Sequence, residues 1–236
     1  MLVLAIDTCD ENGSVSVLKD GAVVETIVHS GGEGYSSWLL PTVDQLLAAA
    51  AAKLSGVDVF AVATGPGSFT GVRIGLTTVK AWGEVFGKPI AAMSRLEVLA
   101  SECQPGSSFV ASFIDAQRGQ IFGALYTRDA HDLELAGEEV VTTPKDFLER
   151  VTKDAEKTAV GWVSTTPRVL EDQPLWPERA LRGETILQVP HVLAPLIGKL
   201  GIQKVLRGDV RDALSLDANY VRRSYVEMPA KPAHEA

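Results

Sequence analysis

Apolar residues follow one another without interruption over residues 2–6, and the run stops at Asp7-Thr8. A continuous apolar run predicts a strand that is covered on both faces, here ending in a carboxylate and a hydroxyl. Residues 14–17 alternate between polar and apolar, Asp20-Gly21 is typical of a hairpin turn, and residues 23–28 are again strand-like. The chain is therefore predicted to open as a three-stranded meander.

The hydrophobic period changes to that of a helix over residues 38–54, with Pro41 in the first turn. A strand at 58–63, a glycine-rich loop and a helix at 70–86 follow without a gap. A short strand at 90–93 and a short helix at 96–102 end before Pro105-Gly106, which we interpret as the boundary between two lobes.

The second half begins with strand-like runs at 109–114 and 120–126 around a turn at 115–119. Helices are predicted at 144–151 and 191–200 and a strand at 158–162, while the Pro- and Arg-rich stretch 165–183 shows no assignable period. The predicted division is an N-terminal lobe at 1–104, a C-terminal lobe at 105–228 and a flexible tail at 229–236. Meanders followed by alternating helices and strands predict an α/β fold with mixed sheets and a cleft between the lobes.

The composition and charge of the chain exclude several classes of protein. The 236 residues are 46% hydrophobic, which is typical of a folded chain. A net charge of −8 disfavours direct binding of nucleic acid. Cys9 and Cys103 are isolated, which predicts a reducing compartment without disulfides or a zinc site. With no long apolar segment and no signal peptide pattern, we expect a cytoplasmic protein without a membrane anchor.

The glycine-rich segment 64–75 lies between a predicted strand and a predicted helix. Its glycines permit close backbone approach, and the helix N-terminus behind them could hold an anion such as phosphate. The segment matches neither the GxxxxGK[ST] loop nor the dinucleotide GxGxxG pattern. The alternative is a tight turn capped by Ser68 or Thr70.

Asp7 and Thr8 are the second candidate site, because a carboxylate at the end of a central strand could hold a hydrated magnesium ion. The alternative is a local Asp-Thr turn. The four histidines are scattered and no GxSxG is present, so we assign no catalytic residue and no metal ligand. The helix at 70–86 is apolar on more than one side, which indicates either burial within the domain or contact with another chain.

Five segments resemble the bacterial TsaB (YeaZ) family. They are Leu4-Ala5-Ile6-Asp7-Thr8, Leu40-Pro41, the run from Gly65 to Gly75, Asp115-Ala116 with Arg118-Gly119, and Tyr220-Val221-Arg222. The resemblance spans nearly the whole chain and implies a two-lobe actin-like (ASKHA, ribonuclease H-like) fold. Relatives often have a histidine and a serine before the Leu-Pro pair, where this chain has residues 35–38 (Tyr-Ser-Ser-Trp).

The resemblance also implies a function. Members of the family act as non-catalytic partners that bind and activate the paralogue TsaD, which transfers a threonylcarbamoyl group to adenosine in tRNAs that read codons starting with A. No cofactor is then required by this chain, whereas ATP or ADP and a metal belong to TsaD and to TsaE. The resemblance further implies that a homodimer forms in the absence of TsaD and that this chain contacts tRNA only as part of the complex. The alternatives are an actin-like small-molecule kinase and a glycoprotease-like peptidase.

Two sets of residues carry these expectations. The motif loop comprises Gly65, Pro66, Gly67, Ser68, Phe69, Thr70, Gly71 and Arg73. The partner surface on the two helices of the first lobe is predicted to comprise Trp38, Thr42, Gln45, Ala49, Val72, Leu76, Val79 and Trp82.

Overall fold

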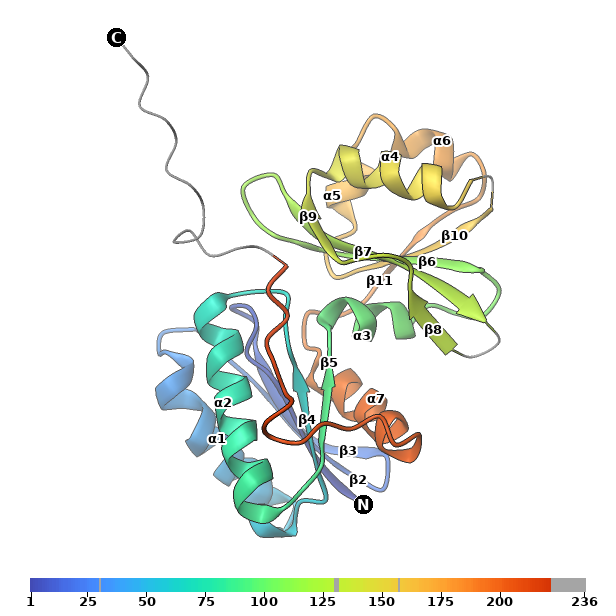
Figure 1. Cartoon of the computed structure of the whole chain (residues 1–236). Coiled ribbons are helices and arrows are strands. Elements are labelled where there is room, and N and C mark those ends of the chain that lie inside the picture. Colours follow the sequence, from blue (N-terminus) through green and yellow to red (C-terminus); the bar gives the residue numbers. More distant parts are fainter. Residues whose placement is uncertain (30, 130–131, 157, 222–236) are drawn as a thin grey trace.

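The computed structural model describes residues 1–29, 31–129, 132–156 and 158–221. The predicted tail at 229–236 and Arg222 of the last motif lie outside these residues. Two lobes are visible in Figure 1, each built on a mixed sheet with helices on both faces. No helix in the described part of the chain is both long and apolar enough to cross a bilayer.

The sheet of the first lobe has the strand order β3-β2-β1-β4-β5. Its strands are β1 (Leu2–Asp7), β2 (Ser14–Lys19), β3 (Ala22–Val28), β4 (Val59–Ala63) and β5 (Ile90–Met93). The predicted meander forms β1 to β3, which pair antiparallel, and β4 pairs parallel with β1. Every residue of β1 after Leu2 is buried, because the strand is central and is covered on both faces.

Helices α1 (Tyr35–Ala49) and α2 (Phe69–Phe86) lie side by side on one face of this sheet. Helix α1 ends at Ala49 and not at residue 54 as predicted. Ala51 has a left-handed φ of 50°, and the N–H of Ala52 donates to the carbonyl of Leu47 at 2.8 Å, which closes the last turn. Leu54–Gly56 forms a separate 3₁₀ turn.

The second lobe repeats the topology of the first. Its strands are β6 (Phe109–Asp115), β7 (Ile121–Asp129), β8 (Asp132–Leu135), β9 (Val140–Thr142), β10 (Val160–Ser164) and β11 (Ile186–Gln188). The order is β11-β10-β6-β7-β8, with β9 also paired to β7. Central β6 has an antiparallel neighbour (β7) and a parallel neighbour (β10), as β1 has in the first lobe. The sheet order therefore shows a duplication that the sequence did not reveal.

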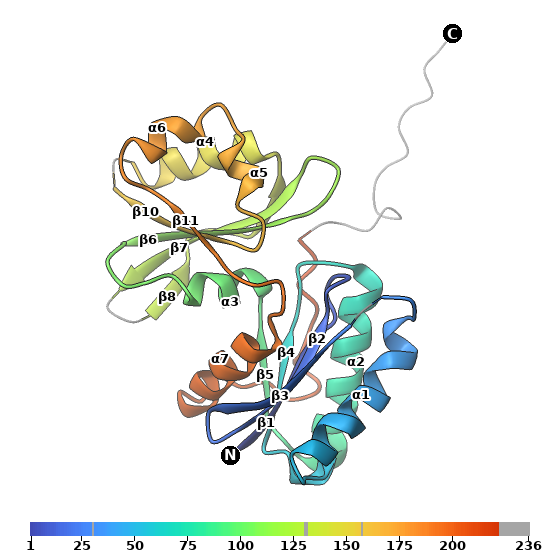
Figure 2. The ribbon, with the colours of Figure 1, turned by 180° about the vertical axis from the view of Figure 1, so that it is seen from behind.

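Three helices cover the outer face of the second sheet (Figure 2): α4 (Pro144–Asp154), α5 (Arg168–Glu171) and α6 (Trp176–Ala180). The stretch 165–183, which has no clear sequence period, contains the two short helices α5 and α6. Together with the sheet, the three helices enclose an aromatic core that includes Phe147, Trp162 and Trp176.

The predicted extent of the second lobe needs a correction, because the chain returns to the first lobe after β11. Helix α7 (Ala194–Leu206) packs on β1, β2, β4 and β5, on the face opposite α1 and α2. Beyond it, Arg211 pairs with Ile90, and the N–H of Asn219 donates to the carbonyl of Thr64. A contiguous second lobe at 105–228 is therefore wrong in its last part. The strands of the first sheet are buried on this face as well, and among the described residues the distant helix α7 supplies the cover.

Helix α3 (Arg95–Ser101) joins the lobes. It follows β5 of the first sheet and packs on β6, β7 and β10 of the second sheet. The hydroxyl of Ser112 in β6 donates to the carbonyl of Leu96 at 2.8 Å. The first residues of α3 therefore lie where the two lobes meet.

Candidate functional site

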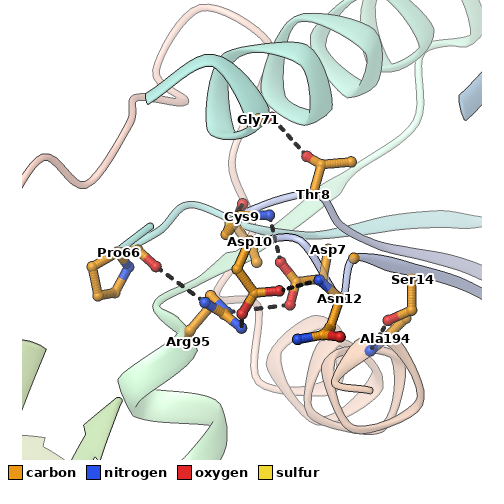
Figure 3. Close-up of polar contacts among 12 residues, drawn as sticks. Asp7, Thr8, Cys9, Asp10, Asn12, Ser14, Pro66, Gly71, Arg95 and Ala194 are labelled. Carbon is orange, nitrogen blue, oxygen red and sulfur yellow. Dashed lines mark hydrogen bonds and ion pairs between the residues drawn. The ribbon is translucent and has the colours of Figure 1, made fainter. Parts of the chain in front are cut away.

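The carboxyl end of β1 is built from Asp7, Thr8, Cys9 and Asp10 (Figure 3). The Asp7 side chain is fully buried, and its Oδ1 accepts from the N–H of Cys9 at 2.9 Å. The buried Thr8 hydroxyl donates to the carbonyl of Gly71 in α2 at 2.7 Å. The local Asp-Thr turn expected as an alternative is present, and Thr8 also ties β1 to α2.

Arg95 is the cation of this site. Its side chain is 1% exposed and places Nε 3.2 Å from Asp7 Oδ2, while Nη2 pairs with the carboxylate of Asp10. Its Nη1 donates to the carbonyl of Pro66 at 3.5 Å, and its backbone N–H donates to the carbonyl of Gly65 at 2.7 Å. One guanidinium therefore connects the end of β1, the glycine loop and α3.

The electrostatics follow from burial and from this pairing. Burial raises the pKa of Asp7, and the Arg95 guanidinium opposes that shift. Burial alone would lower the pKa of Arg95, but the Asp7 and Asp10 carboxylates outweigh it and raise the pKa of the guanidinium. Burial and then the Asp7 charge hold the pKa of the Cys9 thiol well above its usual range, so Cys9 is no activated nucleophile.

The glycines of the motif loop permit close contact between α2 and the end of β1. A Cβ added at Gly67 would collide with the carbonyl oxygen of Cys9, and one at Gly71 with that of Thr8. One added at Gly75 would lie 2.5 Å from the Thr8 hydroxyl oxygen. Because Gly71 and Gly75 are four residues apart, they share the side of α2 that faces β1, and Gly67 lies in the loop just before the helix.

Ser68 caps α2, as the tight-turn interpretation expected. Its Oγ accepts from the N–H of Gly71 at 3.3 Å, and its own N–H donates to the carbonyl of Cys9 at 2.5 Å. Pro66 is buried, while Ser68, Phe69 and Thr70 are exposed. The glycines of this segment thus serve backbone packing against Thr8 and Cys9.

The structure brings two distant motifs together at the start of α2. The guanidinium of Arg73 lies 3.6 Å from the ring centroid of Phe69, and its Nε donates to the Tyr220 hydroxyl at 2.9 Å. The rings of Phe69 and Tyr220 are 4.8 Å apart. All three side chains are exposed at this corner of the first lobe.

The predicted partner surface is corrected in part, because most of its members face the sheet. The buried ones are Trp38, Thr42, Val72, Leu76 and Val79. Gln45 and Ala49 are exposed and Trp82 is half-buried, with its ring 5.5 Å from Phe60. The apolar stripe of α2 is therefore core, and only the opposite sides of α1 and α2 are free for a partner.

Sequence reasoning missed two residues of the site. Arg95 stands in the first turn of α3, where the helix dipole favours acidic residues, so its position was an available sign that its charge is needed elsewhere. Tyr35, the first residue of α1, donates from its hydroxyl to the carbonyl of Asp10 and accepts from the N–H of Gly13. It holds the loop between β1 and β2 in place.

The duplicated order of the two sheets defines an actin-like, two-lobed protein, as predicted. A solved structure from Pseudomonas aeruginosa, described as similar to the peptidase YeaZ, matches with a TM-score of 0.70 and 29% identity. The match covers 94% of this chain and 99% of that one.

Comparison with known sequences identifies the family within this class of two-lobed proteins. TsaB of Escherichia coli (strain K12), a tRNA threonylcarbamoyladenosine biosynthesis protein, is 30% identical over 198 residues, covering 83% of this chain and 82% of that protein. TsaB of Bacillus subtilis (strain 168) is 33% identical over 126 residues, covering 53% of this chain and 55% of that protein. A family model described as TsaD, tRNA N6-adenosine threonylcarbamoyltransferase, matches residues 25–172. The chain belongs to the TsaB (YeaZ) family.

Proposed function

We propose that this chain is a non-catalytic partner that binds and activates a TsaD paralogue in the transfer of threonylcarbamoyl to the adenosine of ANN-decoding tRNAs. Its relatives named TsaB support a role in this modification, and so does the match to the TsaD family model. TsaD then holds the metal and the nucleotide, TsaE joins the complex, and tRNA is bound only by the assembled complex. The complex is expected in the cytoplasm.

The observation that carries the proposal is the outer side of α1 and α2. Leu40 is 53% exposed and Val85 is 73% exposed, on two helices that lie side by side. Three alanines of the same two helices, Ala48, Ala49 and Ala81, are also exposed. Small and apolar residues on a packed helix pair allow another helix pair to approach closely and exclude water. In the absence of TsaD, a second copy of this chain uses the same side to form a homodimer.

The alternatives have less support. A small-molecule kinase would need a cation and phosphates at the end of β1, where Arg95 already pairs with both carboxylates. A peptidase would need a nucleophile or a metal centre, and within the described ranges no three His, Cys, Asp or Glu side chains form a metal-binding group. Neither alternative is favoured by a particular feature of the structure.

The first experiment is co-purification with the TsaD of the same organism, followed by threonylcarbamoyl transfer to tRNA with and without this chain. A stoichiometric complex and transfer that depends on this chain are expected. If no complex forms and transfer proceeds equally well without it, the proposal is wrong, and ATP turnover by the isolated chain becomes the next measurement.

A surface variant tests which side of the protein binds. Ala49→Glu places a carboxylate on the exposed side of α1 and should weaken the TsaD complex at least tenfold without loss of folding, because the charge would be buried unpaired at the interface. Ala180→Glu makes the same change at an exposed position of α6 in the second lobe and should leave the complex unchanged. Equal affinity of both variants would refute the assignment of the surface to α1 and α2.

A further inference from the structure

Three oxygen groups converge at the carboxyl end of β1. The carboxylates of Asp7 and Asp10 and the carbonyl of Pro66 all line one position, where each contacts a different nitrogen of the same guanidinium (Figure 3). Hard oxygen donors of this kind are the ligands that magnesium and manganese prefer. The Asp10 side chain is 27% exposed, so solvent reaches this edge of the cluster.

The Arg95 guanidinium occupies that position. It contacts all three groups, and its side chain is as buried as that of Asp7. Asp7 Oδ2 and Arg95 Nε make no hydrogen bond within the described chain, although they lie 3.2 Å apart. They meet as charges and not as a directed donor and acceptor. Asp7 thus keeps one buried oxygen aimed at the cation.

We propose that Arg95 is a built-in counter-cation that fills the divalent-cation position between Asp7 and Asp10. The end of β1 is thereby closed to a metal ion and to the phosphates that such an ion would carry. Removal of the Arg95 side chain opens a site for one divalent cation. The inference is independent of the partnership with TsaD, because it concerns only side chains of this chain.

Both the net charge and the available space argue against a divalent cation beside Arg95. Two carboxylates and one guanidinium leave a net charge of −1, whereas the two carboxylates alone match a divalent ion. A magnesium ion on Asp7 Oδ2 would lie about 2 Å from that oxygen. The Arg95 Nε lies 3.2 Å from the same oxygen, so a magnesium ion bound there would be placed beside a second positive charge.

The internal cation is also fixed in place. Arg95 is the first residue of α3, its N–H is bound to the Gly65 carbonyl, and α3 packs on the second sheet. A metal ion can dissociate from such a site, whereas this guanidinium is covalently attached to a backbone that is fixed at the start of α3. The contact between the end of β1 and α3 is therefore maintained without any ligand.

Manganese binding tests the proposal, with free Mn²⁺ measured by electron paramagnetic resonance. The wild type and Arg95→Lys, which keeps a cation, should show no saturable binding. Arg95→Ala and Arg95→Gln, which remove the charge, should each bind one Mn²⁺ with a Kd at least tenfold below the highest Mn²⁺ concentration at which the wild type shows no binding. The double variant Arg95→Ala with Asp7→Asn should lose that binding, because one carboxylate is gone.

Each other result counts against the proposal. Saturable Mn²⁺ binding by the wild type that Asp7→Asn removes would overturn it, and so would folded Arg95→Ala and Arg95→Gln proteins that bind no Mn²⁺. If these variants fold poorly in EDTA, Mn²⁺ should raise their melting temperatures or restore refolding, with no effect on the wild type. Failure of Mn²⁺ to do so would likewise overturn the proposal.

Discussion

The close packing of α2 on the end of β1 predicts a strong coupling between Gly75 and Thr8. An alanine at Gly75 would place its Cβ 2.5 Å from the Thr8 hydroxyl oxygen, where ordinary van der Waals contact begins at 3.4 Å. The difference, 3.4 − 2.5 = 0.9 Å, must be taken up by a shift of α2 or by rotation of Thr8. Thr8 is 2% exposed and its hydroxyl is bonded to the carbonyl of Gly71, so rotation breaks a buried hydrogen bond.

Either response, a shift of α2 or a rotation of Thr8, should lower the free energy of unfolding by a similar amount. Overpacking of a core typically costs about 1–3 kcal/mol, and a buried polar group left without its partner costs about 1–3 kcal/mol. Against this, replacing glycine by alanine inside a helix stabilises it by about 1 kcal/mol. In a Thr8→Ala background the collision is gone, and Gly75→Ala should then stabilise the protein. The two substitutions should therefore couple by about 1–3 kcal/mol, and the coupling corresponds to roughly 2–12 °C in melting temperature for a chain of this size.

The assay is urea unfolding followed by circular dichroism for the wild type, both single variants and the double variant. Gly56→Ala is a matched control, because a Cβ at Gly56 meets no atom within 4 Å. That control should be neutral or slightly stabilising. A coupling energy below about 0.5 kcal/mol, the range found for independent sites, would refute the close-packing explanation of the glycines.

Two further predictions concern one half-buried and one buried carboxylate of the second lobe. Glu139 is half-buried and accepts from Asn219 Nδ2 at 2.7 Å, and burial raises its pKa above the usual 4.5. Its contribution to stability is therefore complete below about pH 4.5 and is lost as the pH rises through the raised pKa, because the ionised form is disfavoured in the folded state. Glu139→Gln should melt higher than the wild type at pH 7 and equally at pH 4, and a lower melting temperature at pH 7 would contradict this. Glu184 accepts from Arg179 at 2.8 Å and from Trp162 at 2.6 Å, so Glu184→Leu should lower the free energy of unfolding by about 3–5 kcal/mol. Adding Arg179→Met should recover part of that loss in urea unfolding, and a strictly additive double variant would show that the pair does not act as a unit.

The elements of the first lobe could be predicted because their patterns are local. The apolar run of β1, the turn at Asp20-Gly21 and the capped start of α2 each depend on residues close together in sequence. Errors arose where tertiary context decides. Helix α1 stops at Ala49 within an alanine-rich stretch that favours helix, because Ala51 turns the chain toward β4. The short helices α5 and α6 have too few turns to show a period.

The same division applies to the candidate site. The sequence indicated that Asp7 and Thr8 end a buried strand and that the glycine segment starts a helix. It could not show that Arg95, 88 positions beyond Asp7 (95 − 7 = 88), neutralises that carboxylate. Pairing across such a distance is set by the packing of α3 between the sheets, and no local pattern records it.

The sequence by itself determined the order and type of most elements, the acidic character of the chain and the family to which it belongs. These properties follow from hydrophobic period, turn residues and motifs, each of which acts over a few residues. Only the tertiary structure decided that α7 completes the first lobe, that the stripe of α2 is core, and that a guanidinium fills the end of β1. These features depend on which distant surfaces must be covered and which buried charges must be neutralised, and both are decided when the whole chain packs.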